Sequence, residues 1–432
     1  MNYKSIAIES INKDFSSIGG LKLYDFIYNS LKINDEVEYC LPEKKKNNGI
    51  TQQNKFKTLV SSFVCGADCL DDLEWLKLDT LFKQLNGGAM APITAGDFLR
   101  RFNKRSIEQL QDVHTNLALK MRKVIKPNEK NFELSIDSTP HIQTGLKMEG
   151  LQYDYKNNWG LNSQNAYDQF GFSYGFDLRP GATYSGNGAG SMIRNIFHKL
   201  DSKTKKYLRA DSAYCNLEVM NTCINQGAKF ALAMKANVYN PILEKNKNTI
   251  KWKKTKIKFF DSNDCELAEA IYTKDDLAGG LTSLRVVFIR APKTDETYQY
   301  YAICTNMRQH EWKAKKVIQF YRGRANCENF IKEQKYAMDF KHFPCKKLNA
   351  NKVYGLIGSI AYNMMRMSSF LINENRGCLS KKIRKILLEI PCQLVSHARR
   401  LTVKMNFKRK EVFDCCYNKL EKLVARFYEK ST

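Results

Sequence analysis

No run of about 18 consecutive apolar residues occurs in the sequence, and a helix needs roughly that length to cross a bilayer, so we expect no membrane-spanning segment. No G-x-x-x-x-G-K-S/T loop occurs either, which leaves nucleotide hydrolysis without support. The first ten residues, MNYKSIAIES, lack the basic start, apolar run and small-residue cleavage site of an export signal. We therefore expect the chain to stay in the cytoplasm.

The cysteines show neither a disulfide pattern nor the spacing of a zinc site. The 13 cysteines are an odd number, and the closest pairs, Cys65 with Cys69 and Cys415 with Cys416, lack a second Cys or His pair at zinc-site spacing. The six histidines are dispersed, and we interpret them as structural or surface residues. The sequence thus predicts reduced thiols rather than disulfides, and no zinc site.

Acidic residues are in deficit. Among 432 residues, 70 Lys and Arg stand against 44 Asp and Glu, a net charge of +26. Repulsion on this scale opposes compaction unless a polyanion is bound, so nucleic acid is the first candidate partner. Hydrophobic residues make up 43% and charged residues 26% of the chain, which excludes a disordered or collagen-like protein.

The pattern divides the chain into five segments. Residues 1–125 have apolar side chains at three- and four-residue spacing, which predicts helices that dock on DNA, on a second subunit or on the rest of the chain. Residues 126–236 alternate strands with helices, which is typical of an α/β sheet. Residues 237–310 are rich in strands, and residues 311–345 and 346–432 return to a helical pattern. Expected strands in the insertion are Lys251–Phe260, Leu284–Ile289 and Tyr298–Cys304.

Two aspartates lie at the ends of strands expected in the second segment. Phe132–Asp137 alternates apolar and polar residues, and Pro140 is expected to end that strand. Lys206–Ser212 is a second such strand, with Asp211 at its end and Ser212 as the cap of a helix over Ala213–Gln226. Sites in α/β sheets gather where strands end, so Asp137 and Asp211 are candidate site residues. The remaining elements expected here are the strands Phe170–Leu178 and Lys229–Lys235 and the helix Ser191–Leu200.

The C-terminal segment carries most of the charge. Residues 341–432 hold 20 basic and 6 acidic residues, a net charge of +14. Solvated charge is the ordinary explanation of one basic run, but three runs in succession favour a surface that contacts phosphates. The runs are Lys381–Lys385, Arg399–Arg400 and Lys408–Lys410.

A further pattern lies between Tyr321 and Lys335. If this stretch is one helix, the spacing of three, four and seven residues places Tyr321, Arg324, Glu328 and Lys335 on one face. An isolated surface helix with ion pairs would have the same pattern. Together with Asp137 and Asp211, however, Glu328 could complete a set of three carboxylates. Such hard oxygen ligands suit two Mg²⁺ or Mn²⁺ ions for phosphodiester chemistry, although 44 acidic residues allow many other triples.

These residues resemble a known family. Asp137 in Ser-Ile-Asp-Ser-Thr, Asp211 in Arg-Ala-Asp-Ser-Ala-Tyr, and Tyr-x₂-Arg-x₃-Glu-x₆-Lys at Tyr321, Arg324, Glu328 and Lys335 resemble the DDE transposases of bacterial insertion sequences that carry the Y-R-E-K signature. The β-rich stretch before Glu328 matches that branch. The resemblance implies an α/β fold, an RNase H-like mixed sheet with a β-rich insertion, flanked by helical N- and C-terminal regions.

The resemblance also implies roles. Asp137, Asp211 and Glu328 would hold two Mg²⁺ or Mn²⁺ ions for cleavage at transposon ends and strand transfer into target DNA. Tyr321, Arg324 and Lys335 would bind DNA phosphates. The expected partners are double-stranded DNA, as terminal inverted repeats and target, and a second copy in a homodimer on DNA, in the bacterial cytoplasm with the nucleoid.

Some relatives hold a flipped base with a tryptophan. Trp252 and Trp312 are candidates by location, but we expect both to serve packing and leave them out of the site.

Two rival functions remain open from the sequence. One is another RNase H-like nuclease that only hydrolyses DNA. The other is a DNA-binding protein derived from a transposase whose chemistry has lapsed. All three carboxylates are present, which favours an active enzyme.

Overall fold

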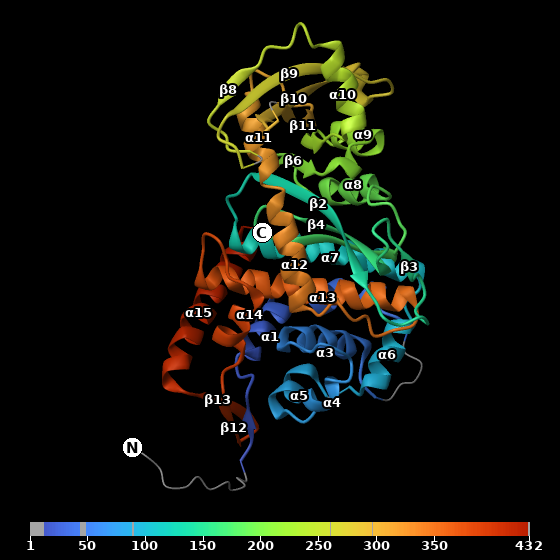
Figure 1. Ribbon diagram of the computed structural model, residues 1–432. Helices are drawn as coiled ribbons and strands as arrows, with labels where there is room; N and C mark the ends of the chain where they lie inside the picture. The colour runs from blue at the N-terminus through green and yellow to red at the C-terminus, as the bar shows by residue number, and fades with distance from the viewer. Residues whose placement is uncertain (1–12, 44–48, 89, 260, 296, 431–432) are drawn as a thin grey trace, which may run out of the picture.

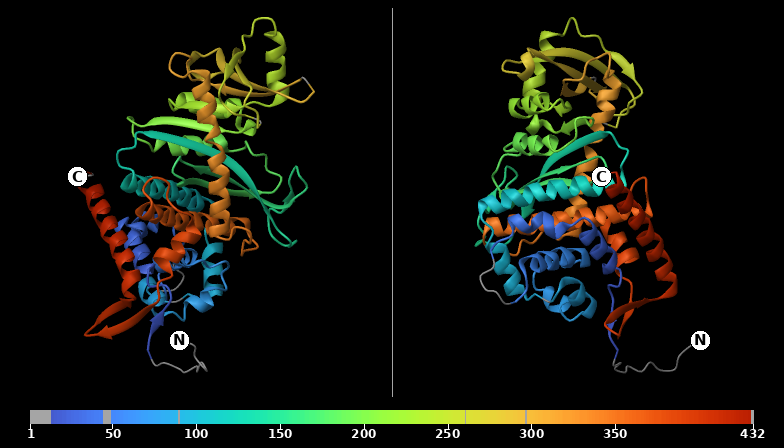
Figure 2. Two further views of the ribbon diagram at one scale, coloured as in Figure 1. Left: turned by 60° about the vertical axis from the view of Figure 1, so that its left-hand side comes forward. Right: turned by 180° about the vertical axis from the view of Figure 1, so that it is seen from behind.

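The computed structural model describes residues 13–43, 49–88, 90–259, 261–295 and 297–430. It stacks as layers, with the inserted strands at one end, the central sheet next, and two layers of helices beyond it (Figures 1 and 2). Within these residues, no helix combines the length and apolar character that crossing a membrane requires.

The central sheet carries the order of an RNase H-like fold. Its five core strands are β2 (Asn131–Ile142), β4 (Trp159–Tyr167), β5 (Ser173–Pro180), β6 (Lys205–Ala210) and β7 (Lys229–Ala233). Across the sheet they lie in the order β5-β4-β2-β6-β7. The first three strands form an antiparallel meander, while β6 is parallel to β2 and β7 is parallel to β6. β2 is therefore central, because it pairs with β4 of the meander on one edge and with β6 on the other.

Helices connect and extend this sheet. α8 (Ala189–His198) joins β5 to β6, and α9 (Leu217–Asn225) joins β6 to β7, while the short β3 (Gln152–Tyr153) pairs with the start of β4. α9 begins later than the sequence predicts. A short 3₁₀ turn over Ser212–Tyr214 comes first, and Asn216, not Ser212, caps the helix by accepting from Val219 N at 3.0 Å.

The insertion continues the same sheet. After α10 (Ala236–Lys245), the strands β8 (Lys253–Thr255), β9 (Cys265–Thr273), β10 (Ser283–Pro292) and β11 (Tyr298–Thr305) follow. β11 pairs antiparallel with β7, so the insertion and the core strands, together with β3, form one 10-stranded sheet. The β-rich prediction is confirmed, but α10 was missed. The expected strand Lys251–Phe260 shrinks to three residues, and Phe260 itself lies outside the described residues.

Strand β2 is longer than the sequence predicts. Pro140 was expected to end it, yet β2 continues to Ile142 because residues Ser135–Ile142 pair with β4. On its other edge β2 loses its partner β6 after Ile136, and proline is tolerated at such an open edge. Asp137 consequently lies inside β2, where its pairing with β6 stops.

The predicted N-terminal helices are present. They are α1 (Leu21–Ser30), α2 (Ile33–Val37), α3 (Gln52–Cys65), α4 (Leu73–Leu76), α5 (Thr80–Asn86), α6 (Pro92–Arg100) and α7 (Lys104–Ile125). The 25-residue α13 (Leu348–Ile372) packs against α3, α6, α7 and β5, and 21 of its residues are buried. The helical regions from both ends of the chain thus share one hydrophobic core with the sheet.

The C-terminal region is not wholly helical. α14 (Ser380–Ile383) and α15 (Phe407–Glu429) flank a hairpin of β12 (Cys392–His397) and β13 (Arg400–Met405), which pairs with β1 (Phe15–Ser16). The hairpin turns through Ala398 and Arg399, both with positive φ. In the first basic run, Arg384 is not a surface residue. Its guanidinium donates to the carbonyls of Phe63, Val64 and Ala337, near the ends of α3 and of the helix Ala325–Ala337.

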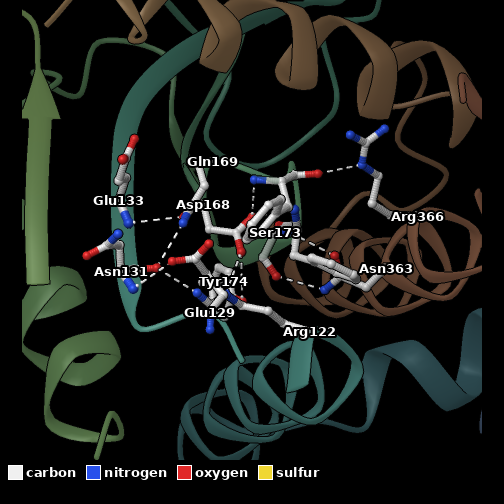
Figure 3. A network of polar contacts seen from close by, with 12 residues as sticks. Arg122, Glu129, Asn131, Glu133, Asp168, Gln169, Ser173, Tyr174, Asn363 and Arg366 are labelled. Carbon is white, nitrogen blue, oxygen red and sulfur yellow. Dashed lines mark hydrogen bonds and ion pairs between the residues drawn. The ribbon is translucent and has the colours of Figure 1, made fainter. Parts of the chain in front are cut away.

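A buried carboxylate ties the sheet to the helices. Asp168, in the turn between β4 and β5, accepts from the backbone N–H groups of Phe170 at 2.9 Å and Phe172 at 3.0 Å. The Arg122 guanidinium of α7 lies 3.1 Å from it, and the Tyr174 hydroxyl donates at 3.2 Å (Figure 3). Burial raises the pKa of Asp168 even though Arg122 and these N–H groups favour the charged form.

The same turn is held from α13. Asn363 accepts from Ser173 N at 2.8 Å and donates to Ser173 O at 2.7 Å, and Arg366 donates to Phe170 O at 2.7 Å (Figure 3). The turn is therefore fixed between α7 and α13.

Replacing Asp168 with Ala should cost about 3–5 kcal/mol, because Arg122 then loses its carboxylate partner in a buried site. The matched control is Asp177→Ala on β5, whose ion pair with Lys352 at 3.1 Å is partly exposed and contributes about 0–1 kcal/mol. Urea unfolding measures both. Equal midpoints for the two variants would contradict this account of the turn.

Candidate active site

Two aspartates meet because neighbouring parallel strands end their pairing together. The last paired residues are Ile136 of β2 and Ala210 of β6, and the next residues along each strand are Asp137 and Asp211. Partners on parallel strands project to the same face of a sheet, so the two carboxylates emerge side by side. Their electrostatic interaction is strong enough to shift the pKa of Asp137.

Each carboxylate is oriented by a backbone N–H group. Asp137 Oδ1 accepts from Ser138 N at 2.8 Å, and Asp211 Oδ1 accepts from Ala213 N at 2.8 Å. The Asp137 side chain is 15% exposed, so one oxygen is fixed while solvent still reaches the group.

Glu328 comes from the helix that crosses this sheet. α11 (Ala314–Arg322) leads into α12 (Ala325–Ala337), and α12 packs across β2 and β4 (Figure 1). Cys327 and Ile331 are buried on the sheet side, which leaves Glu328, 57% exposed, beside the edge that bears Asp137.

Arg324 joins two of the three carboxylates. Its Nη1 lies 3.2 Å from Asp137 Oδ2, and its Nη2 donates to Glu328 Oε1 at 2.7 Å. A single guanidinium therefore lies between the strand and the helix. Among the side chains that the structure describes, no three His, Cys, Asp or Glu are grouped so that they could hold a metal ion, and Arg324 lies between Asp137 and Glu328.

The donor set nonetheless fits a divalent cation. Asp137, Asp211 and Glu328 offer only carboxylate oxygens, which hard cations prefer. Burial, reinforced by the negative charge of Asp211, raises the pKa of Asp137 from 3.8 to about 6, although Ser138 N and Arg324 lower it. Negative charge here is thus incompletely compensated, and an added cation would favour the ionised acid.

Tyr321 is buried but lies near the acidic residues. It is 5% exposed in the cluster between α11 and the insertion, where its hydroxyl lies 2.7 Å from that of Tyr301. The charges of Arg324 and Asp211 both act on the pKa of Tyr321, which burial raises. The single helix that the sequence predicts is interrupted at Gly323. A Cβ there would come within 2.3 Å of the Arg209 guanidinium, which donates to Phe320 O at the end of α11.

Lys335 lies two turns after Glu328 on α12. Its ammonium donates to Pro140 O, and burial together with Lys341 lowers its pKa. Lys335 and Glu328 both line a cleft of about 500 Å³ that opens beside Asp137. Of the sequence candidates, the structure thus gathers Asp137, Asp211, Arg324, Glu328 and Lys335 around one edge, and Tyr321 is buried beneath the insertion within electrostatic reach of Arg324 and Asp211.

Other residues of this cleft were missed from the sequence. Lys332 and Tyr336 follow Glu328 at steps of four, a spacing that places them on one helical face and that could have found them. Ile142, Lys341 and His342 also line the cleft, but no spacing in the sequence connects them to Glu328.

Both tryptophans left out of the site pack against neighbours. The Trp312 ring contacts those of Tyr207 and Phe320. The Arg290 guanidinium lies over Trp252, 4.1 Å from the ring centroid.

The strand order is that of an RNase H-like sheet, and carboxylates lie where the parallel pairing of β2 with β6 ends. This arrangement is typical of enzymes that cut and join phosphodiester bonds. The family model described as "Transposase DDE domain group 1" matches residues 1–425. This chain belongs to that family of DDE transposases. It is a DNA transposase, it binds DNA, and enzymes of this kind use divalent metal ions.

No curated protein sequence matches the chain. Among solved structures, it is similar to a chain of "Cryo-EM structure of piggyBac transposase synaptic complex with hairpin DNA (SNHP)", with 12% identity and a TM-score of 0.41, over 96% of this chain and 82% of that one.

Asp137→Asn should stabilise the protein at neutral pH without divalent metal. The folded pKa of about 6 exceeds the unfolded value of 3.8, so stability falls as pH rises between about 4 and 6. Removing the charge should therefore raise the free energy of unfolding by about 1–3 kcal/mol at pH 7.5, and the gain should vanish near pH 4.

Urea unfolding in EDTA at both pH values measures this difference. Asp35→Asn, at an exposed aspartate of α2, is the control and should show no gain at either pH. A gain for Asp137→Asn that is equal at both pH values would contradict the prediction.

Proposed function

We propose that this transposase cuts the ends of a bacterial insertion sequence and joins them to target DNA, with Asp137, Asp211 and Glu328 as its catalytic residues. The Y-R-E-K signature at Tyr321, Arg324, Glu328 and Lys335 supports the branch. The observation that carries the assignment is the register of β2 with β6, which makes Asp137 and Asp211 the first residues beyond the last parallel pair.

The three carboxylates would hold two Mg²⁺ or Mn²⁺ ions. When bound, these ions would supply the Lewis acid that activates water or a 3′-hydroxyl and stabilises the leaving oxygen. The chain's own residues position these carboxylates. Ser138 N and Ala213 N each fix one aspartate oxygen, and α12, which packs against β2, carries Glu328.

Arg324 and Lys335 are proposed to bind DNA phosphates beside the carboxylates. The planar Arg324 guanidinium suits a phosphate, and the Lys335 ammonium lies at the edge of the same cleft. Tyr321 is assigned by the signature, and its buried position beside Tyr301, within electrostatic reach of Arg324, suits an indirect role.

We propose that the terminal inverted repeats and the target are bound as double-stranded DNA in the cytoplasm, with the nucleoid. The helical region 1–125 and the basic region 346–432 flank the catalytic segments and are proposed to contact DNA or a second subunit. The net charge of +14 in residues 341–432 supports the phosphate contact.

Asp211→Ala should abolish Mg²⁺-dependent cleavage of a terminal repeat while leaving DNA binding within about twofold, because Asp211 contributes a metal ligand and no phosphate contact. Cleavage gels and a binding titration in Ca²⁺ measure the two properties. Asp35→Ala is the matched control and should retain both.

The same assays separate the rival functions. Binding without cleavage by the unaltered chain would indicate a lapsed enzyme. Cleavage without strand transfer would indicate a nuclease of the RNase H-like class. Unimpaired cleavage by Asp211→Ala would reject the proposed carboxylate set.

A homodimer should form on paired DNA ends, because two ends are joined most simply by two active sites. Light scattering of the complex with a terminal repeat should give the mass of two chains. One chain on two ends would contradict the dimer without affecting the assignment of the carboxylates.

A further inference from the structure

The hairpin of β12 and β13 has a fixed base. Cys392 and Leu394 of β12 are buried against Leu81 of α5, and Val403 and Met405 of β13 pack against the same cluster. On its other edge, the start of β12 pairs with β1. The N-terminal region therefore holds the base of the hairpin through side chains and through the backbone.

Beyond this base the hairpin projects into solvent. Residues 396–402 are all exposed, and the hairpin extends away from the helices at the end of the molecule opposite the inserted strands (Figure 2). Past the packed pair of Leu394 with Val403, each strand continues for three residues before the turn, or about 10 Å. This reach suits the major groove of DNA, which is about 8.5 Å deep.

Cations without acidic partners cover the projecting part. Arg399 lies in the turn, and Arg400 and Lys404, four residues apart on β13, share the face opposite to the packed one. The ion pairs described after residue 380 involve Lys410 and Lys419 of α15, so none neutralises the hairpin. Residues 392–405 contain no Asp or Glu. Their positive charge is thus left for a partner to neutralise.

The charge continues along the chain on both sides of the hairpin. Residues 381–412 hold 10 basic and 2 acidic residues, a net charge of +8. Arg409, near the start of α15, donates to Lys385 O at 3.4 Å, which brings the basic run before the hairpin next to the run after it. A polyanion is therefore the partner that this region fits best.

The turn of the hairpin is not built for stability alone. Ala398 and Arg399 separate the paired residues His397 and Arg400, and their φ angles are 48° and 61°. Two-residue turns with positive φ at both positions prefer Asn followed by Gly, because a Cβ is unfavourable there. This chain instead has an arginine at the point that projects furthest. A backbone strain of this kind is typical of functional positions.

We propose that the β12–β13 hairpin enters the major groove of double-stranded DNA, with Arg399 contacting base edges and Arg400 and Lys404 contacting phosphates. The major groove, about 12 Å wide, admits a two-stranded ribbon, whereas the minor groove is only about 6 Å wide. The proposal rests on the proposed function, which brings transposon ends and target DNA to the chain as duplexes.

The place of the hairpin also says which part of the duplex it contacts. The helical layers lie between the hairpin and the sheet that carries Asp137 (Figures 1 and 2). The hairpin therefore holds DNA at a distance from the phosphate that is cut. Its contribution is to affinity and position, and the carboxylates perform the chemistry.

A second copy of the chain fits this surface less well. β13 is an edge strand of the described three-stranded sheet, and Leu401 on it is 38% exposed, both of which suit a protein partner. Pairing of two such edges would however bring Arg400 and Lys404 of one copy against those of the other. Like charges on an edge strand oppose such pairing, whereas DNA neutralises them.

The first test changes the turn and keeps the hairpin. Ala398→Asn combined with Arg399→Gly supplies the residues that the turn prefers, so the variant should fold at least as well as the unaltered chain. Binding to a terminal-repeat duplex in Ca²⁺ should weaken about 5- to 100-fold. Dimethyl sulfate methylates guanine N7 in the major groove and adenine N3 in the minor groove. Protection of guanine N7 should be lost in this variant, with adenine N3 unchanged.

The second test removes the phosphate contacts. Arg400→Gln combined with Lys404→Gln should lower the slope of log affinity against log salt concentration by about 2, because each phosphate contact contributes about 0.9. The matched control, Lys203→Gln with Lys205→Gln, removes the same charge from two exposed lysines at the end of β6 opposite Asp211. It should keep the slope, the N7 protection and, within about twofold, the affinity.

A duplex of equal length and unrelated sequence distinguishes the two sources of DNA. Weakened binding of the terminal repeat alone assigns the hairpin to the transposon end. Equal weakening of both duplexes assigns it to DNA of any sequence, target DNA included.

Unchanged affinity and N7 protection in both hairpin variants would overturn the proposal. So would a variant that keeps its DNA affinity but changes from two chains to one in light scattering, because the hairpin would then be a subunit interface.

These outcomes are independent of the cleavage assay. If Asp211→Ala abolishes cleavage while the hairpin variants bind normally, the catalytic assignment holds and only the groove contact is lost. If the hairpin variants lose the duplex while Asp211→Ala still cleaves, the groove contact holds and the carboxylate set is wrong.

Discussion

The parallel pairing of β2 with β6 is the constraint on which the site depends. Because this pairing ends at Ile136 and Ala210, the backbone itself delivers two aspartates to one edge of the sheet. No flexible loop has to be ordered for them to meet. The rest of the fold keeps that edge in place: α12 lies across β2 and β4, and the turn that follows β4 is locked to α7 and α13 through Asp168.

Charge balance is the second constraint. Bringing three carboxylates together is unfavourable in a partly buried site, and the raised pKa of Asp137 expresses that cost. Arg324 offsets part of it by bridging Asp137 and Glu328. The basic excess of the chain suits a DNA partner, and one of its cations, Arg324, compensates carboxylates at the site.

Sequence patterns placed two strands of the sheet within a few residues. Apolar and polar residues alternate over Phe132–Asp137, and Lys206–Ser212 was predicted as a short strand that ends near Asp211. β4 was missed because it is buried on both faces and many of its buried residues are polar. Ser163 contacts His141 at 2.7 Å, and Gln164 donates to Ser185 O at 2.7 Å, so the hydrophobic signal is absent. In the run Lys381–Lys385 only Arg384 differs from the expected surface. It donates to helix-end carbonyls, while Lys381, Lys382 and Lys385 are exposed.

By itself, the sequence determined the local elements and the identity of the acidic residues at their ends, since periodicity and short motifs depend only on neighbours along the chain. Only the tertiary structure decided which side chains face one another. It places the Arg324 guanidinium between Asp137 and Glu328, sets Tyr321 against Tyr301, and opens the cleft where Tyr336 lies beside the acids. These contacts join residues far apart in the chain, and packing of the whole sheet and its helices selects them.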